Sequence, residues 1–388
     1  MSFLQFLINY KWPLLFYALI VLLIYLNRKK FTFESKIIAI YKTKLGMNII
    51  DRLATAYPRT IRFLGYIGVI IGFAGMLGSA IYIGYQFIVM VTIPGAPPAV
   101  SPVIPGLPIP GTGIVIPFLQ GILALFIAVV VHELSHGFVA RAHGLKIKST
   151  GFVMFGPLPG AFVEPDEKSL KKKNLHVRNS VFAAGPLANV IAAGVAVLLL
   201  SFILAPVING MAVDKGMTFA QVTSDSPAER AGLQTNITYT MLNDQPLHSV
   251  NDFIDVLEKL HVNDTIVLGN ENYSQAVVLG SSPTNSEKTY VGVTGLQTVT
   301  ELKPGVSSFL YGVILWIFIL LTWVFILNVG LGMVNLLPIG PLDGGRMFEA
   351  TLVKFFNEKI AHRVWATVSI IGVVILFLLL VFPLVRGL

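Results

Sequence analysis

The sequence predicts an α-helical polytopic membrane protein with about six transmembrane helices and one inserted α+β soluble domain. Of its 388 residues, 54% are hydrophobic and only 12% are charged, whereas soluble domains carry about 25% charged residues. Apolar runs recur along the chain, and basic residues gather in the short segments between alternate runs. Residues 207–305 differ from the rest because their apolar runs are short and polar side chains are common.

The N-terminal region, residues 1–117, is expected to hold two spans and a loop. Its first apolar run, Trp12 to Leu26, precedes a basic cluster at residues 28–30. A cleaved signal peptide has the opposite order, so we expect a retained anchor with its N-terminus outside. The basic residues of 28–62 then indicate a cytoplasmic loop.

The second span is expected at Phe63 to Ile93, and a loop rich in proline and glycine follows at residues 94–117. Such a composition cannot continue a helix. With the preceding loop inside, this loop lies outside, and its lack of charge is compatible with a position in the membrane surface.

The membrane core is expected in two parts, residues 118–206 and 306–388, on either side of the soluble domain. Its four spans are Phe118–Ala142, Ser180–Pro206, Ser308–Leu337 and Val364–Val385. Basic residues at 141–178 and 346–363 mark the cytoplasmic ends of these spans. The soluble domain is therefore expected to be extracytoplasmic.

The composition also excludes some functions. The net charge is +8, but basic residues confined to short loops are topology signals, so we expect no nucleic-acid partner. The chain has no cysteine, which excludes disulfides, thiol catalysis and thiolate metal sites. Any transition metal must therefore be bound by histidine and carboxylate side chains.

The sequence VHELSHG at residues 131–137 carries a recognisable chemistry. His132 and His136 fall on one helix face, about 40° apart, so both imidazoles can reach one Zn²⁺ at about 2.0–2.1 Å. Glu133 can accept a proton from metal-activated water without binding the metal. Ionisable groups at membrane depth cost about 2.5–3.5 kcal/mol each, which disfavours a purely structural role for all three.

A catalytic zinc usually has three protein ligands, so a third ligand must come from elsewhere. The extended motif with a third histidine fails, because Val139 and Ala142 stand at its glycine and histidine positions. Glu164 or Glu167 could serve on spacing alone. Asp343, in NLLPIGPLDGGR, is the better candidate because the topology puts it near the same membrane face as the histidines. The alternative for Asp343 is a helix cap or turn residue.

These motifs resemble the site-2 protease family of intramembrane zinc metalloproteases. The resemblance rests on HELSHG, on AAGPLANV at residues 183–190 and on NLLPIGPLDGG, in this order, and it covers roughly residues 118–350. It implies that zinc is held by His132, His136 and Asp343. Glu133 would then be the general base and proton shuttle.

The resemblance implies further roles near the metal. Asn335 would hold the substrate or stabilise the oxyanion, and Asn189 would make a polar contact to the substrate. The alternative for Asn189 is a buried amide that bonds between helices. The segment FGPLPGAFVEPDE, residues 155–167, matches a membrane-associated hairpin whose edge could pair with an unwound substrate strand.

Within the soluble domain, residues 224–260 resemble a PDZ domain. A short helix is expected at Ser226–Ala228, a strand–turn with Asn243 and Asp244 at its tip, and an amphipathic helix over Val250 to Leu260. PDZ domains bind extended peptide ends by strand addition. We therefore expect peptide ends as ligands of this domain.

Together these features predict an intramembrane zinc metalloprotease, an endopeptidase that hydrolyses peptide bonds in or near transmembrane segments in regulated intramembrane proteolysis. We expect single-span membrane proteins as substrates, a location in the lipid bilayer of the cell membrane, and an active site toward the cytoplasm. The alternative is a non-catalytic zinc-binding scaffold or transporter with a peptide-docking domain. The enzyme is favoured because Glu133 is present and no fourth histidine or cysteine obviously closes the metal site.

Overall fold

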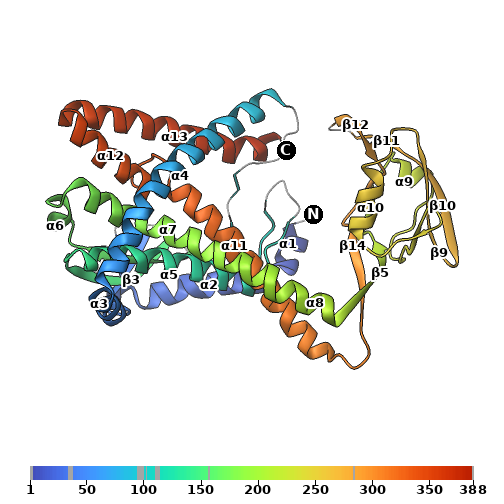
Figure 1. The fold of residues 1–388 in the computed structure, drawn as a ribbon, viewed down its shortest axis with the longest axis horizontal. Helices are drawn as coiled ribbons and strands as arrows, with labels where there is room; N and C mark the ends of the chain where they lie inside the picture. The colour runs from blue at the N-terminus through green and yellow to red at the C-terminus, as the bar shows by residue number, and fades with distance from the viewer. Residues whose placement is uncertain are drawn as a thin grey trace. The chain divides into compact units, whose positions relative to one another are not determined.

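The computed structural model describes residues 3–33, 38–93, 100–101, 103–109, 114–155, 158–282 and 285–386. The chain forms two compact units (Figure 1). The helical unit comprises Met1–Leu200 and Ile317–Leu388, and the inserted unit comprises Ser201–Trp316.

Five helices in the described residues are long and apolar enough to cross a membrane. They are α4 (Pro58–Thr92), α5 (Phe118–Ala142), α7 (Leu175–Leu199) with its continuation η2 (Leu200–Leu204) and α8 (Ala205–Met211), α11 (Ser308–Asn335) and α13 (Glu358–Arg386). Large apolar side chains such as Ile70 and Phe202 are exposed on them, as expected of helices solvated by lipid. This is the architecture of a polytopic membrane protein.

The first predicted span corresponds to α2 (Lys11–Leu26), an apolar helix of 16 residues that follows α1 (Phe3–Asn9). This helix is shorter than the roughly 20 residues that cross a bilayer. Five of the six predicted spans are therefore present as long apolar helices, and the count of six stays a prediction. α2 packs on the start of α5, where Phe16 and Tyr17 contact Phe118 edge to face.

The candidate site residues lie on α5, α7, the end of α11 and α12 (Asp343–Phe355). α7 packs along α5 and also contacts α4 and α12, so it lies at the centre of the helical unit (Figure 1). α12 packs against α13. This arrangement brings residue 343 close to residues 132–136, although more than 200 residues separate them along the chain.

A four-stranded antiparallel sheet completes the helical unit, with the order β1-β2-β3-β4. Its strands are β1 (Thr32–Phe33), β2 (Ile38–Thr43), β3 (Ile147–Phe155) and β4 (Leu158–Pro165). β3 and β4 form the hairpin expected around residues 155–167, and its turn at 156–157 lies outside the described residues. β4 is the last strand of the sheet in the described part of the chain.

The N-terminal segment contributes more to this unit than the sequence indicated. Residues 28–62 were expected only as a cytoplasmic loop, yet they include a short 3-10 helix η1 (Arg28–Lys30), β1, β2 and helix α3 (Met47–Ala56). α3 packs on α5, and its Ile50 is fully buried.

The segment 167–171 forms a short helix, α6 (Glu167–Lys171).

The inserted unit is a small α+β structure with its own hydrophobic core, in which Phe219 stacks on Tyr239 and both are buried. Its strands pair as one sheet of order β10-β9-β7-β8 and as the pairs β11-β12, β13-β6 and β14-β5. Its elements are β5 (Ala212–Thr218), β6 (Gln221–Val222), α9 (Pro227–Arg230), β7 (Met241–Leu242), β8 (Gln245–Pro246), α10 (Val250–Leu257), β9 (Thr265–Asn270), β10 (Tyr273–Val278), β11 (Gly280–Ser282), β12 (Asn285–Tyr290), β13 (Val293–Thr294) and β14 (Gln297–Leu302).

The local predictions for this unit agree with its structure. Asn243 and Asp244 have φ of 50° and 59°, the left-handed conformation that a two-residue hairpin turn requires. α10 begins with a capping box between Ser249 and Asp252, which satisfies backbone N–H groups at the helix start. The assignment of this unit to the PDZ fold stays a prediction.

Candidate metal centre

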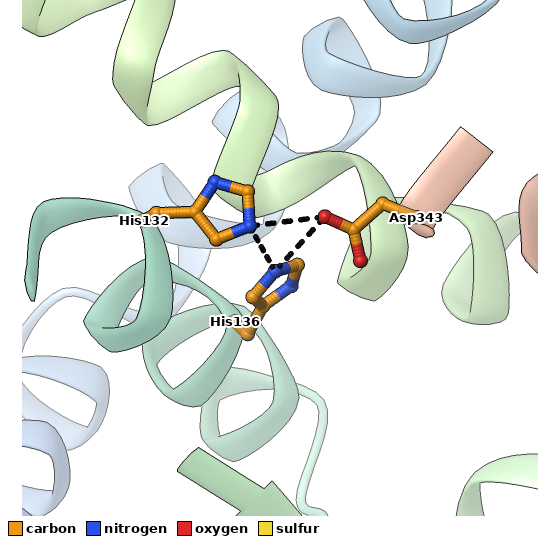
Figure 2. Close-up of side chains that lie close together, drawn as sticks. All are labelled: His132, His136 and Asp343. Carbon is orange, nitrogen blue, oxygen red and sulfur yellow. Dashed lines mark hydrogen bonds and ion pairs between the residues drawn. The ribbon is translucent and has the colours of Figure 1, made fainter. Parts of the chain in front are cut away.

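Three side chains from two helices converge on one point (Figure 2). The Nε2 atoms of His132 and His136 are 3.2 Å apart. The Oδ2 atom of Asp343 lies 3.1 Å from the first and 3.3 Å from the second. Ligands at about 2.0–2.1 Å from a tetrahedral zinc are separated by about 3.3–3.4 Å. The triangle therefore has the size of one face of a zinc coordination shell.

The imidazoles are oriented by bonds on their other nitrogens. His132 Nδ1 donates to Oδ1 of Asn189 at 2.8 Å, and His136 Nδ1 donates to the backbone carbonyl of Val181 at 2.7 Å. A neutral imidazole protonated on Nδ1 has a lone pair on Nε2. Both lone pairs therefore face the carboxylate, and such bonds typically fix ligand histidines in metal sites.

The surroundings of the Asp343 carboxylate show whether a metal ion fits between the three side chains. Oδ2 of Asp343 is buried, and no aligned hydrogen-bond donor reaches it from the described residues. Its nearest groups are the two Nε2 atoms. Three acceptor atoms that face one another in a buried position repel unless a proton or a cation lies between them. The donor set of two imidazoles and one carboxylate suits Zn²⁺.

The backbone of α7 has to approach α5 closely to complete this geometry. A Cβ atom on Gly185 would lie 2.5 Å from Nε2 of His136 and 2.6 Å from Nε2 of His132. Asn189 lies one helical turn later, where its Oδ1 reaches His132. The AAGPLANV motif thus supplies both the space for the imidazoles and one of their acceptors.

Asp343 is placed by a tight reversal between α11 and α12. α11 ends at Asn335 and α12 begins at Asp343. A Cβ on Gly344 would collide with the backbone of Leu336, and one on Gly345 would collide with that of Ile339. The two glycines therefore allow the start of α12 to pack against the preceding turn. This packing turns Asp343 toward the histidines.

Glu133 lies beside the cluster but outside it. Its Oε2 accepts a hydrogen bond from the backbone N–H of Val163 on β4, at 3.1 Å. Glu133 lines a cavity of about 660 Å³ that is also lined by His132, His136 and Asp343. Asn335, at the end of α11, lines the same cavity.

The two glutamates that spacing left open as third ligands also line this cavity but do not join the cluster. Glu164 forms an ion pair with Lys42 at 2.9 Å. The hydroxyl of Ser149 and the ammonium of Lys42 hold the pKa of the Glu164 carboxyl below its usual range. Glu167 is exposed. Of the carboxylates considered from the sequence, Asp343 is the one that meets both histidines.

Two contacts at the site could not be found by sequence reasoning. One is the acceptor on Val181, and the other is the donor on Val163. Both are backbone groups, and backbone groups carry no residue signature. Asn189 had been considered for a substrate contact or for a bond between helices, and the structure places its Oδ1 on His132.

A known protein family and several known proteins are similar to this chain. Peptidase family M50 matches residues 120–379 of the chain. An uncharacterized protein of Methanocaldococcus jannaschii is 29% identical over 266 residues, which are 67% of this chain and 63% of that protein. Zinc metalloprotease RasP of Oceanobacillus iheyensis is 23% identical in an alignment of 276 positions, and this alignment covers 56% of this chain and 61% of RasP.

A putative zinc metalloprotease of Campylobacter jejuni is 24% identical in an alignment of 352 positions, and this alignment covers 69% of this chain and 92% of that relative. The chain spans less than two thirds of the length of the M. jannaschii protein and of RasP. The family match contains all three members of the cluster as well as Glu133.

Proposed function

The chain belongs to peptidase family M50, the site-2 protease family, and from this membership we propose that it is a zinc metalloendopeptidase that cleaves peptide bonds in or near transmembrane segments. The observation that carries the proposal is the triangle of three acceptor atoms beside Glu133. A zinc ion would be held by Nε2 of His132, Nε2 of His136 and the carboxylate of Asp343. When bound, it would act as a Lewis acid toward water and the scissile carbonyl.

Glu133 is assigned the proton transfers. In hydrolysis, a water oxygen adds to the carbonyl carbon, and the C–N bond then breaks. Glu133 accepts the proton that the attacking water loses and delivers it to the leaving amine nitrogen. Its position in the lining of the site cavity supports this role. The carboxylate side chain is returned unchanged, so atoms and charge balance over one turnover.

The free edge of β4 is proposed to hold the substrate as an added strand. Successive residues of a strand direct their N–H groups to opposite sides. The Val163 N–H points away from β3 and reaches Glu133. The backbone N–H groups of the odd-numbered residues of β4 therefore point toward the open edge of the sheet. Of these odd-numbered residues, Pro159 and Pro165 lack an N–H. Ala161 and Val163 would therefore supply the N–H donors for an added substrate strand. A substrate that pairs with Val163 would free the Glu133 oxygen for the reaction.

The two asparagines have different proposed roles. Asn335 lines the cavity at the end of α11, which supports a role for its amide as a donor to the developing oxyanion or as a contact to the substrate backbone. Asn189 is fully buried. We therefore assign it the positioning of His132 and not a substrate contact.

We propose single-span membrane proteins as substrates, in a process of regulated intramembrane proteolysis. A helical substrate hides its amides in intrachain hydrogen bonds, so it must unwind before it can pair with β4. The charge pattern supports an active site toward the cytoplasm and an inserted unit outside. There a PDZ-like unit would screen substrates by size or bind the end of a previously trimmed substrate.

A reconstituted cleavage assay tests the proposal. Wild-type protein in liposomes should cleave a single-span peptide, lose this activity with a chelator and regain it with Zn²⁺. Glu133→Gln should retain zinc but lose activity by roughly 10²–10⁴-fold, the range for general acid–base groups. Full activity of this variant would refute the role of Glu133. A wild-type protein that binds zinc but cleaves no peptide would favour the scaffold or transporter.

A further inference from the structure

A second cavity lies on the other side of Glu133. It has a volume of about 260 Å³, and Glu133 and Val163 line both this cavity and the site cavity. We call it the α3 cavity because Gly46 and Ile49, at the start of helix α3, form part of its wall. Thr43 at the end of β2, Leu45, α5 and strands β3 and β4 form the rest. The mechanism proposed above does not use it.

The lining of the α3 cavity is almost entirely apolar and includes Val130 and Leu134 of α5. Three further lining residues, Leu45, Ile49 and Phe126, are 72%, 54% and 54% exposed, so they form an apolar mouth at the surface. Water is poorly held by a cavity that offers few polar partners. Ligand pockets for whole small molecules usually measure about 300–1,000 Å³, so this smaller cavity suits a single side chain.

The register of β4 places one side chain of an added substrate strand on the face of the sheet that covers this cavity. Ala161 lines the cavity, and Val163, two residues further along β4, packs against α5 near Gly137. Residues paired across neighbouring strands have side chains on the same face of the sheet. A substrate residue paired with Ala161 therefore projects toward α5, beside Glu133 and next to the bond under attack.

We propose that the α3 cavity is a specificity subsite that takes a large apolar side chain of the substrate beside the scissile bond. This inference rests on the proposed function and adds the class of residue that the enzyme selects. The N-terminal segment, which has no catalytic motif, then has a defined role: its residues 43–49 form one wall of the subsite. The small side chain of Ala161 leaves the subsite open from the β4 side.

The test uses full-length protein in phosphatidylcholine–phosphatidylglycerol liposomes and a set of single-span peptides. The peptides differ only in one residue beside the cleaved bond, which is Ala, Leu, Phe or Trp. Wild type should cleave the Leu and Phe peptides roughly tenfold faster than the Ala peptide, as one apolar contact in a pocket can provide. Ala161→Leu should lower the ratio of Phe-peptide to Ala-peptide cleavage roughly tenfold relative to wild type.

A substitution that enlarges the α3 cavity should favour peptides with larger side chains. Ile49→Ala should raise cleavage of the Trp peptide relative to the Leu peptide. Leu53→Ala is the matched control, because Leu53 lies on the same helix, is partly exposed and does not line the cavity. It should keep the wild-type preference. If a lipid chain fills the cavity instead, Ala161→Leu will change all four peptides by the same factor, and this result would overturn the subsite.

A binding measurement tests the proposed subsite independently of the proposed enzyme activity. Zinc-loaded Glu133→Gln should bind the Phe peptide more tightly than the Ala peptide, and adding Ala161→Leu should remove the difference. This readout needs no cleavage, so it decides the subsite even if wild type proves inactive. Equal affinity for the Ala and Phe peptides would reject the subsite while leaving the metalloprotease intact.

Discussion

At the scale of single residues, the site depends as much on the partners of the ligands as on the ligands themselves. Both imidazoles are held by acceptors on α7, one from a side chain and one from the backbone. A buried imidazole keeps its Nε2 lone pair directed at the neighbouring carboxylate only if its ring cannot rotate or change tautomer. The residues on α7 therefore set the tautomer and direction of the two histidines on α5.

Replacing Asn189 tests this dependence. Asn189→Ala should weaken zinc binding by roughly 10–100-fold, the usual effect of losing such a partner, because His132 loses the acceptor for its Nδ1–H. The measurement is competition for zinc against a fluorescent chelator. Asn328→Ala is the control, since Asn328 is also fully buried but bonds only to the backbone of its own helix. Equal zinc affinity in both variants would contradict the positioning role.

The space left by Gly185 gives a second prediction. Gly185→Ala should reduce zinc content strongly, because the added methyl group would meet both imidazoles at 2.5–2.6 Å. Gly194→Ala, on the same helix, has no neighbour within 4 Å of the added atom and should bind zinc like wild type. Metal analysis of the two purified proteins compares them. A Gly185→Ala protein with full zinc content would show that α5 and α7 can separate at this point.

At the scale of elements, the sequence predicted the helix that carries the two histidines well and the sheet only in part. α5 has the bounds expected from its apolar run, Phe118 to Ala142, because hydropathy and the following basic residues both mark its end. β1 and β2 were not predicted. β2 pairs with β3, more than 100 residues later in the chain, and a six-residue strand that depends on a distant partner has no periodic signal of its own.

The role of the β4 edge can be tested by removing one backbone N–H group. Val163→Pro removes the N–H that binds Glu133 and that a substrate strand would use, so peptide cleavage should fall at least tenfold while zinc binding persists. The sheet should tolerate the change, because Pro159 and Pro165 already occupy positions of the same parity.

Val163→Ala keeps the backbone donor and is the matched control for this experiment. It should retain most of the activity, although its smaller side chain loses part of the contact with α5. Cleavage rates and zinc content are compared in the same liposomes. If Val163→Pro cleaves peptide as fast as Val163→Ala, the substrate does not pair with this edge.

The metal site shows what the sequence could and could not predict. His132, Glu133 and His136 follow from a local pattern, because helix geometry alone puts the two histidines on one face. Asp343 required the predicted topology, and spacing alone left Glu164 and Glu167 open. The fold resolves this choice through a tight glycine-dependent turn, which is a matter of backbone packing. The hydrogen bonds from Val163 and to Val181 could not be predicted, because any residue could provide them.

At the scale of the whole molecule, a helical unit carries the candidate metal site and a separate unit is inserted between α7 and α11. The polar composition of residues 207–305 predicted the insertion, and the inserted unit of Ser201–Trp316 contains all of them. The membrane orientation rests on charge alone, since basic residues flank the spans at one end.

The absence of cysteine allows a direct test of this orientation. A single cysteine at the β7–β8 turn, Asp244→Cys, should react with a membrane-impermeant maleimide added to intact cells. Lys172→Cys, in the exposed segment before α7, should react only after the membrane is opened. The reverse labelling pattern would place the inserted unit in the cytoplasm and would invert the proposed route of the substrate.

The central claim is that one zinc ion is shared by two histidines of α5 and the aspartate at the start of α12. An anomalous difference map recorded at the zinc edge, from crystals of zinc-loaded protein, tests it most directly. The account predicts a single peak about 2.0–2.2 Å from Nε2 of His132, Nε2 of His136 and a carboxylate oxygen of Asp343. A zinc ion bound by Glu164 or Glu167, with Asp343 directed away from it, would contradict the account.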